Sequence, residues 1–520
     1  MASVAWIVPS PTEGGGGYRT IVRKARALRE RGHENVFYLV PNEDYRPTDP
    51  SLVADRIERW FGFRPDDVRF RPEVDAAHDA VVATSWDTAS LAASAPCAAK
   101  AYFVQDWEPW FFPMGAARIV AEQSYSLGLA PIVLGRWLAR RLRRKTGARP
   151  AVCDFGVDLG VYRPTDDAVR ERAVCAIWQP EKDRRIAPIL RQALRIVADL
   201  DEGVTVVTYG SAEGPFPGDR RFRHLGLLSV EECNALYCRC RCGVSMSSSN
   251  PSRIPFEMMA AGLPVVDLHR ENNLHDFADG CVALAEPTPA GIASSVLDLL
   301  DDEGSCARMG EAARAWVAGR DIEREDGAFC DALEALVEGR DWDEGETGRT
   351  YAAAPRPLRE DCVARQRELE ARERREVVLA RTAVRANRLD VRLDPGPADE
   401  VVTSSVAVWS GMSQDDLRWV DLAREEDGTW RTVIPLPARP DAPTIWHVHL
   451  YVTRRGQEAA CEARWWQFVD EAGTAGCTHE QPLPDGGAAR SGFDAGPVEA
   501  EDVGRERGGI RSLLARLGRS

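Results

Sequence analysis

The sequence predicts an α/β protein with two doubly wound parallel sheets, followed by a small all-β domain. Through the first part of the chain, short apolar runs alternate with segments of helical periodicity, such as residues 4–8 followed by residues 18–31. Buried strands that are joined by helices are typical of parallel sheets. Further along, apolar and polar residues alternate, as in residues 445–452, and this pattern indicates antiparallel strands.

Two series of strands define the first two domains. The expected strands of residues 1–165 are 4–8, 36–40, 80–84, 101–105 and 131–134, and those of residues 166–345 are 173–178, 204–209, 242–246 and 264–268. The main helices expected in the second series are 186–200, 229–238 and 288–302. Ligands of such sheets bind beyond the carboxyl ends of the strands, so we expect the functional site between these two Rossmann-like domains.

The rest of the chain divides into three parts. Residues 346–388 are expected to form a linker, with a helix rich in Arg and Glu from about residue 356. Residues 389–469 form the expected all-β accessory domain. Residues 470–520 are predicted to be an acidic, Gly-rich disordered segment that ends in a short basic amphipathic helix. This terminal helix would either rest on an anionic membrane surface or remain a solvated end of the chain.

Composition excludes several classes of protein. The chain has 520 residues and a formal net charge of −15, which argues against a general nucleic-acid binder. It contains no apolar run of ~18 residues, and its first expected strand begins at residue 4. We therefore expect neither a membrane span nor a signal peptide. We therefore expect a cytoplasmic protein. Its terminal helix could also contact the inner face of the membrane.

The cysteines and acids do not predict a metal site. Cys233, Cys238, Cys240 and Cys242 crowd together, but their spacing does not match the paired units of structural zinc sites. With 13 cysteines and no secretion signal, reduced thiols are expected. His447 and His449 alternate on one strand face, which favours a structural role over a metal pair. No Asp-x-Asp motif stands in a suitable loop, so no metal is expected.

The most informative segment is residues 247–267. It predicts a loop, a helix that opens near Pro255, and a short buried strand at residues 265–266. Glu257 lies in the first turn of that helix. A carboxylate there can accept hydrogen bonds from both hydroxyls of a ribose, while the helix N-terminus favours a diphosphate. The alternative is an ordinary helix and strand with a solvated acid.

Further candidate residues follow other expected strands. Asp106 and Glu108 stand among indole rings, a combination that suits sugars, and either is a candidate catalytic acid; the alternative is a capping acid with core aromatics. Arg253 is a candidate for neutralising a diphosphate. Ser249 and Asn250 are candidates for binding a nucleotide-sugar donor where it would meet the start of the expected helix, and His224 is a candidate near the nucleobase. The last candidate is the close-approach loop of Gly14, Gly15, Gly16 and Gly17, for which a flexible turn is the alternative.

Five stretches resemble the family-4 glycosyltransferases of GT-B fold, and more narrowly the WsaF-like rhamnosyltransferases. They are residues 8–18, 83–89, 102–113 and 155–164 together with the Glu257 helix. Within this resemblance, Ser249 stands where many family-4 enzymes have the first acid of an E-x7-E motif. The resemblance spans residues 1–340 and implies the GT-B fold, with its two domains facing a cleft.

The resemblance also implies an activity. It is the transfer of L-rhamnose from a dTDP-rhamnose co-substrate to a glycan or lipid-linked glycan of the bacterial cell surface, without metal or other cofactor and with retention. Glu257 would bind the donor ribose, and Lys182 and Arg184, with Arg185 as a third candidate, would face the diphosphate. The glycine loop, Trp86 and Asp87 would line the acceptor side.

The all-β domain resembles a GBS Bsp-like repeat. The matching pieces are residues 408–419, 427–430 and 447–451, and they imply an accessory binding or positioning role. Two other functions remain open for the whole chain. One is a sugar-phosphate enzyme of GT-B fold, such as a phosphorylase or an epimerase. The other is a non-catalytic glycan-binding protein, for which the missing first acid and the all-β domain argue.

Overall fold

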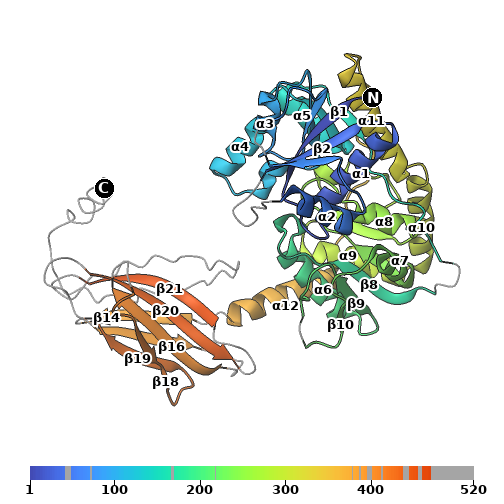
Figure 1. Cartoon of the computed structure of the whole chain (residues 1–520). Helices are drawn as coiled ribbons and strands as arrows, with labels where there is room; N and C mark the ends of the chain where they lie inside the picture. The colour runs from blue at the N-terminus through green and yellow to red at the C-terminus, as the bar shows by residue number, and fades with distance from the viewer. Residues whose placement is uncertain are drawn as a thin grey trace. The chain divides into compact units, whose positions relative to one another are not determined.

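The computed structural model describes residues 1–40, 49–70, 73–165, 169–216, 218–376, 379–385, 388–394, 401–410, 414–436, 444–454 and 460–469. The chain forms two compact units, Met1–Gln366 and Arg367–Ser520 (Figure 1). The predicted acidic segment and terminal helix, residues 470–520, lie outside the described residues. Within the described residues, no helix is long and apolar enough to cross a membrane.

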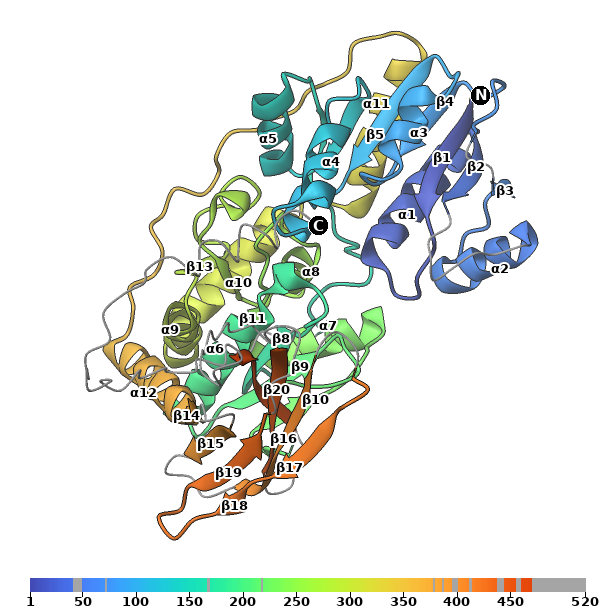
Figure 2. The ribbon, with the colours of Figure 1, turned by 90° about the vertical axis from the view of Figure 1, so that its left-hand side faces the viewer.

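The first unit contains the two predicted parallel sheets (Figure 2). The seven-stranded sheet has the order β3-β2-β1-β4-β5-β6-β7, and the six-stranded sheet has the order β10-β9-β8-β11-β12-β13. The first consists of β1 (Ser3–Pro9), β2 (Glu34–Val40), β3 (Asp67–Arg69), β4 (Ala80–Ala83), β5 (Ala99–Val104), β6 (Ala130–Leu134) and β7 (Ala151–Cys153). The second consists of β8 (Glu171–Ile177), β9 (Thr205–Tyr209), β10 (Phe222–His224), β11 (Cys240–Val244), β12 (Val265–Leu268) and β13 (Ala283–Ala285).

Helices cover both faces of the sheets. Around the first sheet they are α1 (Gly16–Glu30), α2 (Pro50–Phe61), α3 (Ala89–Ser94), the 3-10 helix η1 (Glu108–Phe111), α4 (Ala116–Ser124) and α5 (Arg136–Thr146). Around the second they are η2 (Asp183–Arg185), α6 (Ala187–Leu200), α7 (Val230–Arg239), α8 (Ile254–Ala260), η3 (Glu271–Asn273), α9 (Pro289–Asp301) and α10 (Glu303–Val317). The long predicted strands and helices are confirmed, and with them the GT-B expectation of two Rossmann-like domains.

Alternate residues of β1 enter two different cores. Trp6 and Val8 pack with α1 on one face of the sheet, while Ala5 and Ile7 pack with α5 on the other. Helix α1 buries Tyr18, Ile21, Val22, Ala25 and Leu28, a spacing of three and four residues that places them on one side. A strand that is buried on both faces needs apolar residues throughout, which is why these strands were visible in the sequence.

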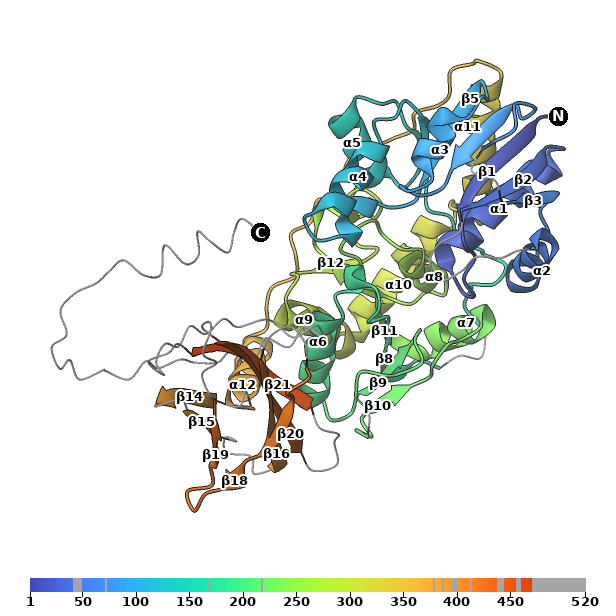
Figure 3. The same ribbon diagram turned by 60° about the vertical axis from the view of Figure 1, so that its left-hand side comes forward.

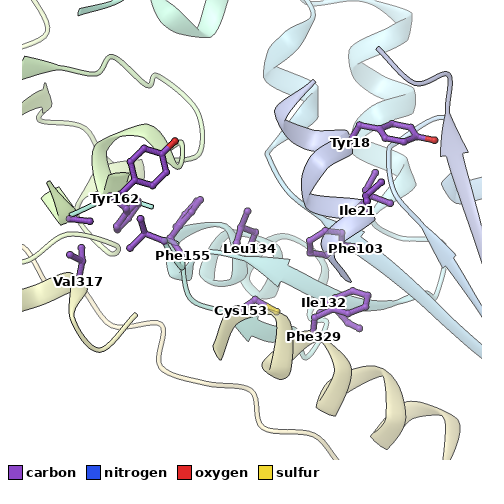
Figure 4. Packing of buried hydrophobic residues seen from close by; sticks show 14 of the residues in the cluster. Tyr18, Ile21, Phe103, Ile132, Leu134, Cys153, Phe155, Tyr162, Val317 and Phe329 are labelled. Atoms are coloured by element: carbon purple, nitrogen blue, oxygen red, sulfur yellow. The ribbon is translucent and has the colours of Figure 1, made fainter. Parts of the chain in front are cut away.

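Helix α11 (Ile322–Val337) belongs by sequence to the second series but packs on the first sheet. It contacts α1, β5, β6 and β7. Its Phe329 ring stacks on Trp6 with centroids 5.5 Å apart and meets Phe103 edge-on at 5.0 Å. Figure 4 shows Phe329 beside Phe103 and Ile132 in this core. The chain thus returns to the first domain after completing the second.

A buried ion-pair cluster joins the same elements. Lys24 of α1 places its Nζ 2.7 Å from Glu325 Oε1 and 2.7 Å from Asp326 Oδ1, and neither Lys24 nor Glu325 has an exposed side chain. Arg23 lies 2.8 Å from Glu325, and Arg253 approaches it to 2.6 Å. Buried charges persist only when they are paired and hydrogen-bonded, so this cluster connects α1, α11 and the start of α8.

The predicted linker helix is shorter than expected. Helix α12 spans Glu360–Glu376, and β14 (Leu379–Arg385) is a strand where the sequence predicts continued helix. The prediction of helix to residue 388 is therefore wrong over this stretch. Strand β14 pairs antiparallel with β15 (Arg388–Asp394) from Leu379↔Asp394 to Arg385↔Arg388. Antiparallel pairing with β15 overrides the helix propensity of the Arg-rich and Glu-rich sequence.

The second unit contains two antiparallel sheets, ordered β14-β15-β19-β18 and β17-β16-β20-β21 (Figure 3). Their remaining strands are β16 (Val401–Ser410), β17 (Arg418–Asp421), β18 (Ala423–Arg424), β19 (Trp430–Pro435), β20 (Thr444–Arg454) and β21 (Ala460–Val469). Leu389, Val406 and Val448 lie in the shared core. His447 stacks on Trp409 at 5.0 Å and His449 meets the same ring edge-on at 4.6 Å, so packing accounts for the alternating histidines.

The crowded cysteines are thiols. Cys238, Cys240 and Cys242 are buried and Cys233 is half-buried, and all four are free; Cys233 and Cys238 lie in α7, and Cys240 and Cys242 lie in β11. Cys238 donates to the carbonyl oxygen of Arg163 at 3.4 Å. Across the described ranges, no group of three His, Cys, Asp or Glu side chains could hold a metal ion.

Candidate functional site

The candidate site lies where loops after β5, β8 and β11 meet. Asp106 follows β5 in the first domain, while the segment Lys182 to Arg185 follows β8 and residues 245–253 follow β11 in the second. Direct contacts between these three segments cross from one domain to the other. The site is therefore at the carboxyl edges of both sheets, as the topology of doubly wound folds predicts.

Asp106 connects the two domains. Its Oδ1 accepts from the backbone N–H of Asn250 at 2.9 Å and of Trp107 at 2.8 Å, and its Oδ2 accepts from Ser249 Oγ at 3.1 Å. Arg184 Nε lies 3.8 Å from the same Oδ2. Burial raises the pKa of Asp106, and Arg184 and the hydrogen bonds oppose that rise. The residue predicted to be catalytic thus contacts two residues predicted to bind the donor.

The loop after β8 carries three cationic side chains in four consecutive positions, residues 182–185. Lys182 is about one-third exposed, with the nearest carboxylate oxygen, of Glu181, at 3.7 Å. The Arg184 guanidinium lies over the Phe111 ring at 5.0 Å from its centroid. Arg185 is only 5% exposed, and burial, followed by the charge of Arg184, lowers its pKa to about 10. Such a concentration of positive charge is suited to an anionic ligand.

Arg185 is held by neutral groups. Its Nη1 donates to the Met246 carbonyl at 3.2 Å, to Ser247 Oγ at 3.2 Å and to Ser252 Oγ at 3.1 Å. Its buried Nε has no hydrogen-bond partner, and no carboxylate forms an ion pair with it in the part of the chain that the structure describes. The next residue, Ile186, has φ of 45°, which is a strained conformation for a β-branched side chain. Strain of this kind concentrates at ligand sites.

Glu257 occupies the first turn of α8, as predicted. Burial raises the pKa of this carboxyl, while Arg253, Arg19 and a hydrogen bond with Tyr162 oppose the rise. Arg19 is on the first turn of α1, so the start of α1 and the start of α8 face the same region. The prediction of an acid at a helix opening between the domains agrees with this geometry, and its role with a ribose remains a prediction.

Two predicted donor residues already have structural partners. Arg253 donates to the Gly156 carbonyl at 2.5 Å and pairs with Glu325. Its guanidinium is therefore part of the buried ion-pair cluster. Asn250 is buried and donates through Nδ2 to the carbonyl oxygens of Gln105 at 2.9 Å and Leu134 at 2.7 Å. The structure therefore places both residues in contacts between the domains.

His224 is also engaged on both sides of its ring. Nδ1 lies 2.9 Å from Thr208 Oγ1 and Nε2 lies 2.9 Å from the Ser211 carbonyl oxygen. These bonds connect β10 to β9 and to the loop after β9. The ring nitrogens thus stabilise that loop. A contact with a nucleobase, as predicted for this region, would have to come from the backbone of the loop.

Glu108 is the first residue of η1, two positions after Asp106. Its Oε2 accepts from the Trp86 N–H at 2.7 Å and from the Tyr102 hydroxyl at 3.0 Å. Burial raises the pKa of Glu108 to about 8. The carboxyl therefore holds a proton at neutral pH, and it connects the segment of Trp86 to the loop that carries Asp106.

The predicted acceptor residues fall into two groups. Gly14 has φ of +71°, and a Cβ on Gly17 would lie 3.8 Å from the Gln105 amide, so the glycine loop borders the Asp106 loop. Gly16 begins α1. The Trp86 ring packs edge-on against Phe112 at 5.4 Å, and exposed Asp87 accepts from Ser85 Oγ. Both groups adjoin the loop that carries Asp106 and Glu108.

Sequence reasoning missed several residues of this region. Asp267, at the end of β12, is fully buried and accepts from the N–H groups of Ser247 at 3.1 Å and Leu268 at 2.8 Å. Burial raises its pKa to about 7, and Arg185 is among the opposing charges. Tyr162 and Arg19 were missed beside Glu257. Tyr162 lies in the stretch 155–164 that carries the resemblance and Asp267 lies at the carboxyl end of a strand, so both had a usable signal, whereas Arg19 had none.

Comparison with known proteins supports the expected class. A family model described as "WsaF, C-terminal domain" matches residues 172–297, which run from β8 to α9. The chain is 30% identical over 345 residues to the O-antigen biosynthesis protein RfbC of Myxococcus xanthus, covering 62% of this chain and 26% of RfbC. The chain thus spans about a quarter of the length of that relative.

Solved structures share the fold at low identity. HepE of Anabaena in complex with UDP-glucose matches with a TM-score of 0.50 and 15% identity, over 64% of this chain and 100% of HepE. HepE in complex with UDP matches with a TM-score of 0.50 and 16% identity over the same shares. This likeness concerns the arrangement of the two Rossmann-like domains.

Proposed function

We propose that the protein is a glycosyltransferase that passes a hexosyl group from a nucleoside diphosphate donor to a bacterial polysaccharide. The observation that carries the proposal is the cationic segment after β8, where Arg185 is buried without a carboxylate partner among the described residues. A diphosphate would supply a negative charge to pair with Arg185, beside the cations of Lys182 and Arg184. The similarity to an O-antigen biosynthesis protein and to a WsaF domain supports polysaccharide synthesis.

In this proposal Arg184, Arg185 and Lys182 bind the diphosphate and Glu257 binds the ribose. As the bond to the sugar breaks, negative charge develops on the leaving nucleoside diphosphate. Fixed cations stabilise that charge without reorganising, which lowers the barrier to transfer. We propose that these side chains act without a metal ion. Solved HepE complexes with UDP and UDP-glucose are consistent with a nucleotide-sugar donor.

Asp106 and the glycine loop would border the acceptor. An acceptor hydroxyl must lose its proton as it attacks, and a carboxylate with a raised pKa accepts a proton readily. Asp106 is bonded to Ser249 and Asn250 in this structure, so substrate binding would have to release one of its oxygens. The donor dTDP-L-rhamnose and retention at the anomeric carbon are the more specific parts of the proposal.

The first test is thermal unfolding of the full chain with dTDP, UDP or GDP. A ligand at ten or more times its dissociation constant stabilises by roughly 1.4 kcal/mol or more. We expect stabilisation by one nucleotide, weakened in Arg184→Ala and in Glu257→Ala. Arg239→Ala is the control, because Arg239 lies before β11 at the opposite edge of the sheet, paired with exposed Glu171.

Donor turnover completes the test. Release of the nucleoside diphosphate from the matching nucleotide-sugar, with transfer to a glycan acceptor, is the expected result. Stabilisation by none of the three nucleotides, together with binding of oligosaccharide and an intact donor, would instead establish a non-catalytic glycan-binding protein.

A further inference from the structure

The segment from Met114 to Leu127 exposes a concentration of large apolar side chains. Met114 is 77% exposed, Ile119 51%, Val120 49% and Leu127 42%. Elsewhere in the described residues of the first unit, exposed residues of this kind are scattered, as at Leu52, Val169 and Leu227. Scattered residues of this kind are normal on a soluble protein, whereas exposed apolar residues concentrated in one short segment indicate an interaction surface.

Of these side chains, Ile119 and Val120 lie on α4, while Met114 precedes the helix and Leu127 follows it. Successive residues turn by about 100°, so Ile119 and Val120 share one arc of the helix. Ala121 and Ser124 on the other side are buried. Glu122 and Arg118 lie between the two sides, 3.8 Å apart. The apolar arc therefore points to solvent.

Helix α5 supplies positive charge beside this arc. Lys145 Nζ lies 3.7 Å from Glu122 Oε2, which puts the end of α5 against α4. The sequence of α5 contains six basic residues and no acid: Arg136, Arg140, Arg141, Arg143, Arg144 and Lys145. Arg144 is 70% exposed in its side chain, and Arg140 is also exposed. Arg136, Arg143, Arg144 and Lys145 each lie within 4 Å of a carboxylate, of Asp154, Glu344, Glu271 and Glu122 respectively, so the six basic residues exceed these four acids by two.

Arg141 of α5 lies over two indole rings of the first domain. Its guanidinium lies 4.5 Å from the centroid of Trp107 and 4.4 Å from that of Trp110. Burial lowers the pKa of Arg141, and nearby Arg118 and Arg144 lower it further, against the opposing charges of Glu271 and Glu122. Positive charge is thus held close to the exposed apolar arc.

We propose that this surface, the α4–α5 face (residues 114–127 and 136–145), docks on an anionic lipid bilayer. Exposed Met, Ile, Val and Leu side chains gain by entering the acyl boundary, and adjacent Lys and Arg are attracted to anionic headgroups. An anionic bilayer fits this surface better than an acidic soluble partner does. The bilayer offers negatively charged headgroups for the basic side chains and an acyl region for the apolar ones. Figure 2 shows α4 and α5 on the domain that carries β5, so docking would bring the Asp106 side of the site near lipid.

The test is co-sedimentation of the full chain with vesicles of phosphatidylglycerol and phosphatidylcholine, against vesicles of phosphatidylcholine alone. We expect binding to the anionic vesicles that weakens as salt rises. Ile119→Glu/Val120→Glu should reduce the partition coefficient by about tenfold or more, and Arg140→Glu/Arg144→Glu should do likewise. The matched control is Val169→Glu/Leu227→Glu, which places the same charges on two exposed apolar residues of the second domain.

Two further readouts keep the result unambiguous. Circular dichroism and nucleotide-induced thermal stabilisation should be the same in wild type and in Ile119→Glu/Val120→Glu, so loss of vesicle binding would not reflect loss of fold or donor site. A tail variant, Leu513→Glu/Leu514→Glu, tests the other basic amphipathic segment. Vesicle binding that is unchanged by the α4–α5 variants, or abolished by the tail variant alone, overturns the proposal, as does wild type that binds neither vesicle.

Discussion

At the scale of single residues, the site contains four carboxyls that differ in the groups around them. Asp106, Glu108, Glu257 and Asp267 all have pKa values raised by burial. They differ in their partners. Asp106 and Glu257 face arginines at the domain boundary, whereas Glu108 accepts from neutral groups. Nearby arginines favour the anionic forms of Asp106, Glu257 and Asp267, and of these three Asp106 and Glu257 lie at the domain boundary.

Asp106→Asn and Glu108→Gln should separate the two predicted catalytic acids. The amide oxygen that Glu108→Gln introduces can still accept from Trp86 and Tyr102, so we expect transfer to change less than about threefold and stability by less than about 0.5 kcal/mol. Asp106→Asn should lower kcat/KM by about a hundredfold, the usual contribution of a general base. Steady-state kinetics with the matching nucleotide-sugar measures both. Equal losses in both variants would assign Glu108 a direct part in proton transfer.

Asp267→Asn should change the pH dependence of stability. The usual pKa of the carboxyl is 3.8 and burial raises it to about 7 in the folded state. Between these values the folded state holds a proton that the unfolded state releases, so stability falls as pH rises. A shift of about three units corresponds to roughly 4 kcal/mol. The amide that replaces the carboxyl keeps one acceptor oxygen for Ser247 and Leu268, so the variant should gain stability over wild type as pH rises from 4 to 8.

Thermal unfolding at several pH values measures this effect. Glu311→Gln, at an exposed position of α10, is the control and should follow wild type. Parallel curves for Asp267→Asn and wild type would show that Asp267 titrates normally in the folded protein.

At the scale of elements, close approach of backbones positions α8, the helix that carries Glu257. A Cβ on Gly310 of α10 would lie 2.5 Å from the Gly262 carbonyl oxygen, in the turn that follows α8. No real Cβ is found at that distance from a backbone atom, so Gly310 lets α10 pack on the turn. The short α8 thus owes its position to packing rather than to its own length.

Gly310→Ala should therefore destabilise the protein, by about 1–3 kcal/mol, through overpacking. Gly304→Ala is a matched control in the first turn of the same helix. Its nearest neighbour would be the flexible Arg308 side chain at 3.2 Å, so we expect no loss and a gain of up to about 1 kcal/mol from helix propensity. Denaturant unfolding compares the two variants. Similar effects in both would mean that α10 can move away from the turn without cost.

At the scale of the whole molecule, the two Rossmann-like domains are held by buried polar contacts as well as by apolar packing. Asp276 of the second domain accepts from the N–H groups of Arg136 and Trp137 at the start of α5, at 2.8 and 3.2 Å. The cluster around Glu325 joins α1, α11 and Arg253. Burial alone would raise the pKa of Glu325, but Arg253, Lys24 and Arg23 hold it well below its usual 4.5.

Glu325→Gln should destabilise the first unit by about 3–5 kcal/mol, because Lys24 and Arg253 lose their shared carboxylate while remaining buried. Asp331→Asn on the same helix is the control, since that carboxyl is 71% exposed and its pair with Arg31 contributes less than about 1 kcal/mol. In wild type the stabilisation from Glu325 is present above pH 4.5 and is lost as pH falls through the lowered pKa. Calorimetry near neutral pH measures the difference between the two variants.

Much of the fold was predictable because its signals are local. The long strands appear as apolar runs, and α1 appears through helical spacing. The edge strands β3, β7, β10 and β13 were not predicted, because strands of three residues carry too little pattern. Strand β14 was predicted as helix, because its pairing partner decides its conformation. In the site, Asp106 and Glu257 were found from their places after a strand and in a helix turn.

The sequence by itself determined two doubly wound sheets, an all-β region after them, and candidate site residues at the carboxyl ends of strands. These follow from periodicity and from residue types that act over a few positions. Only the tertiary structure decided that Arg253 serves Glu325, that Asp106 bonds Ser249 and Asn250, and that α11 returns to the first sheet. Each of these contacts joins residues at least 72 positions apart or elements of different domains. Burial in a shared core, rather than any local pattern, makes them favourable.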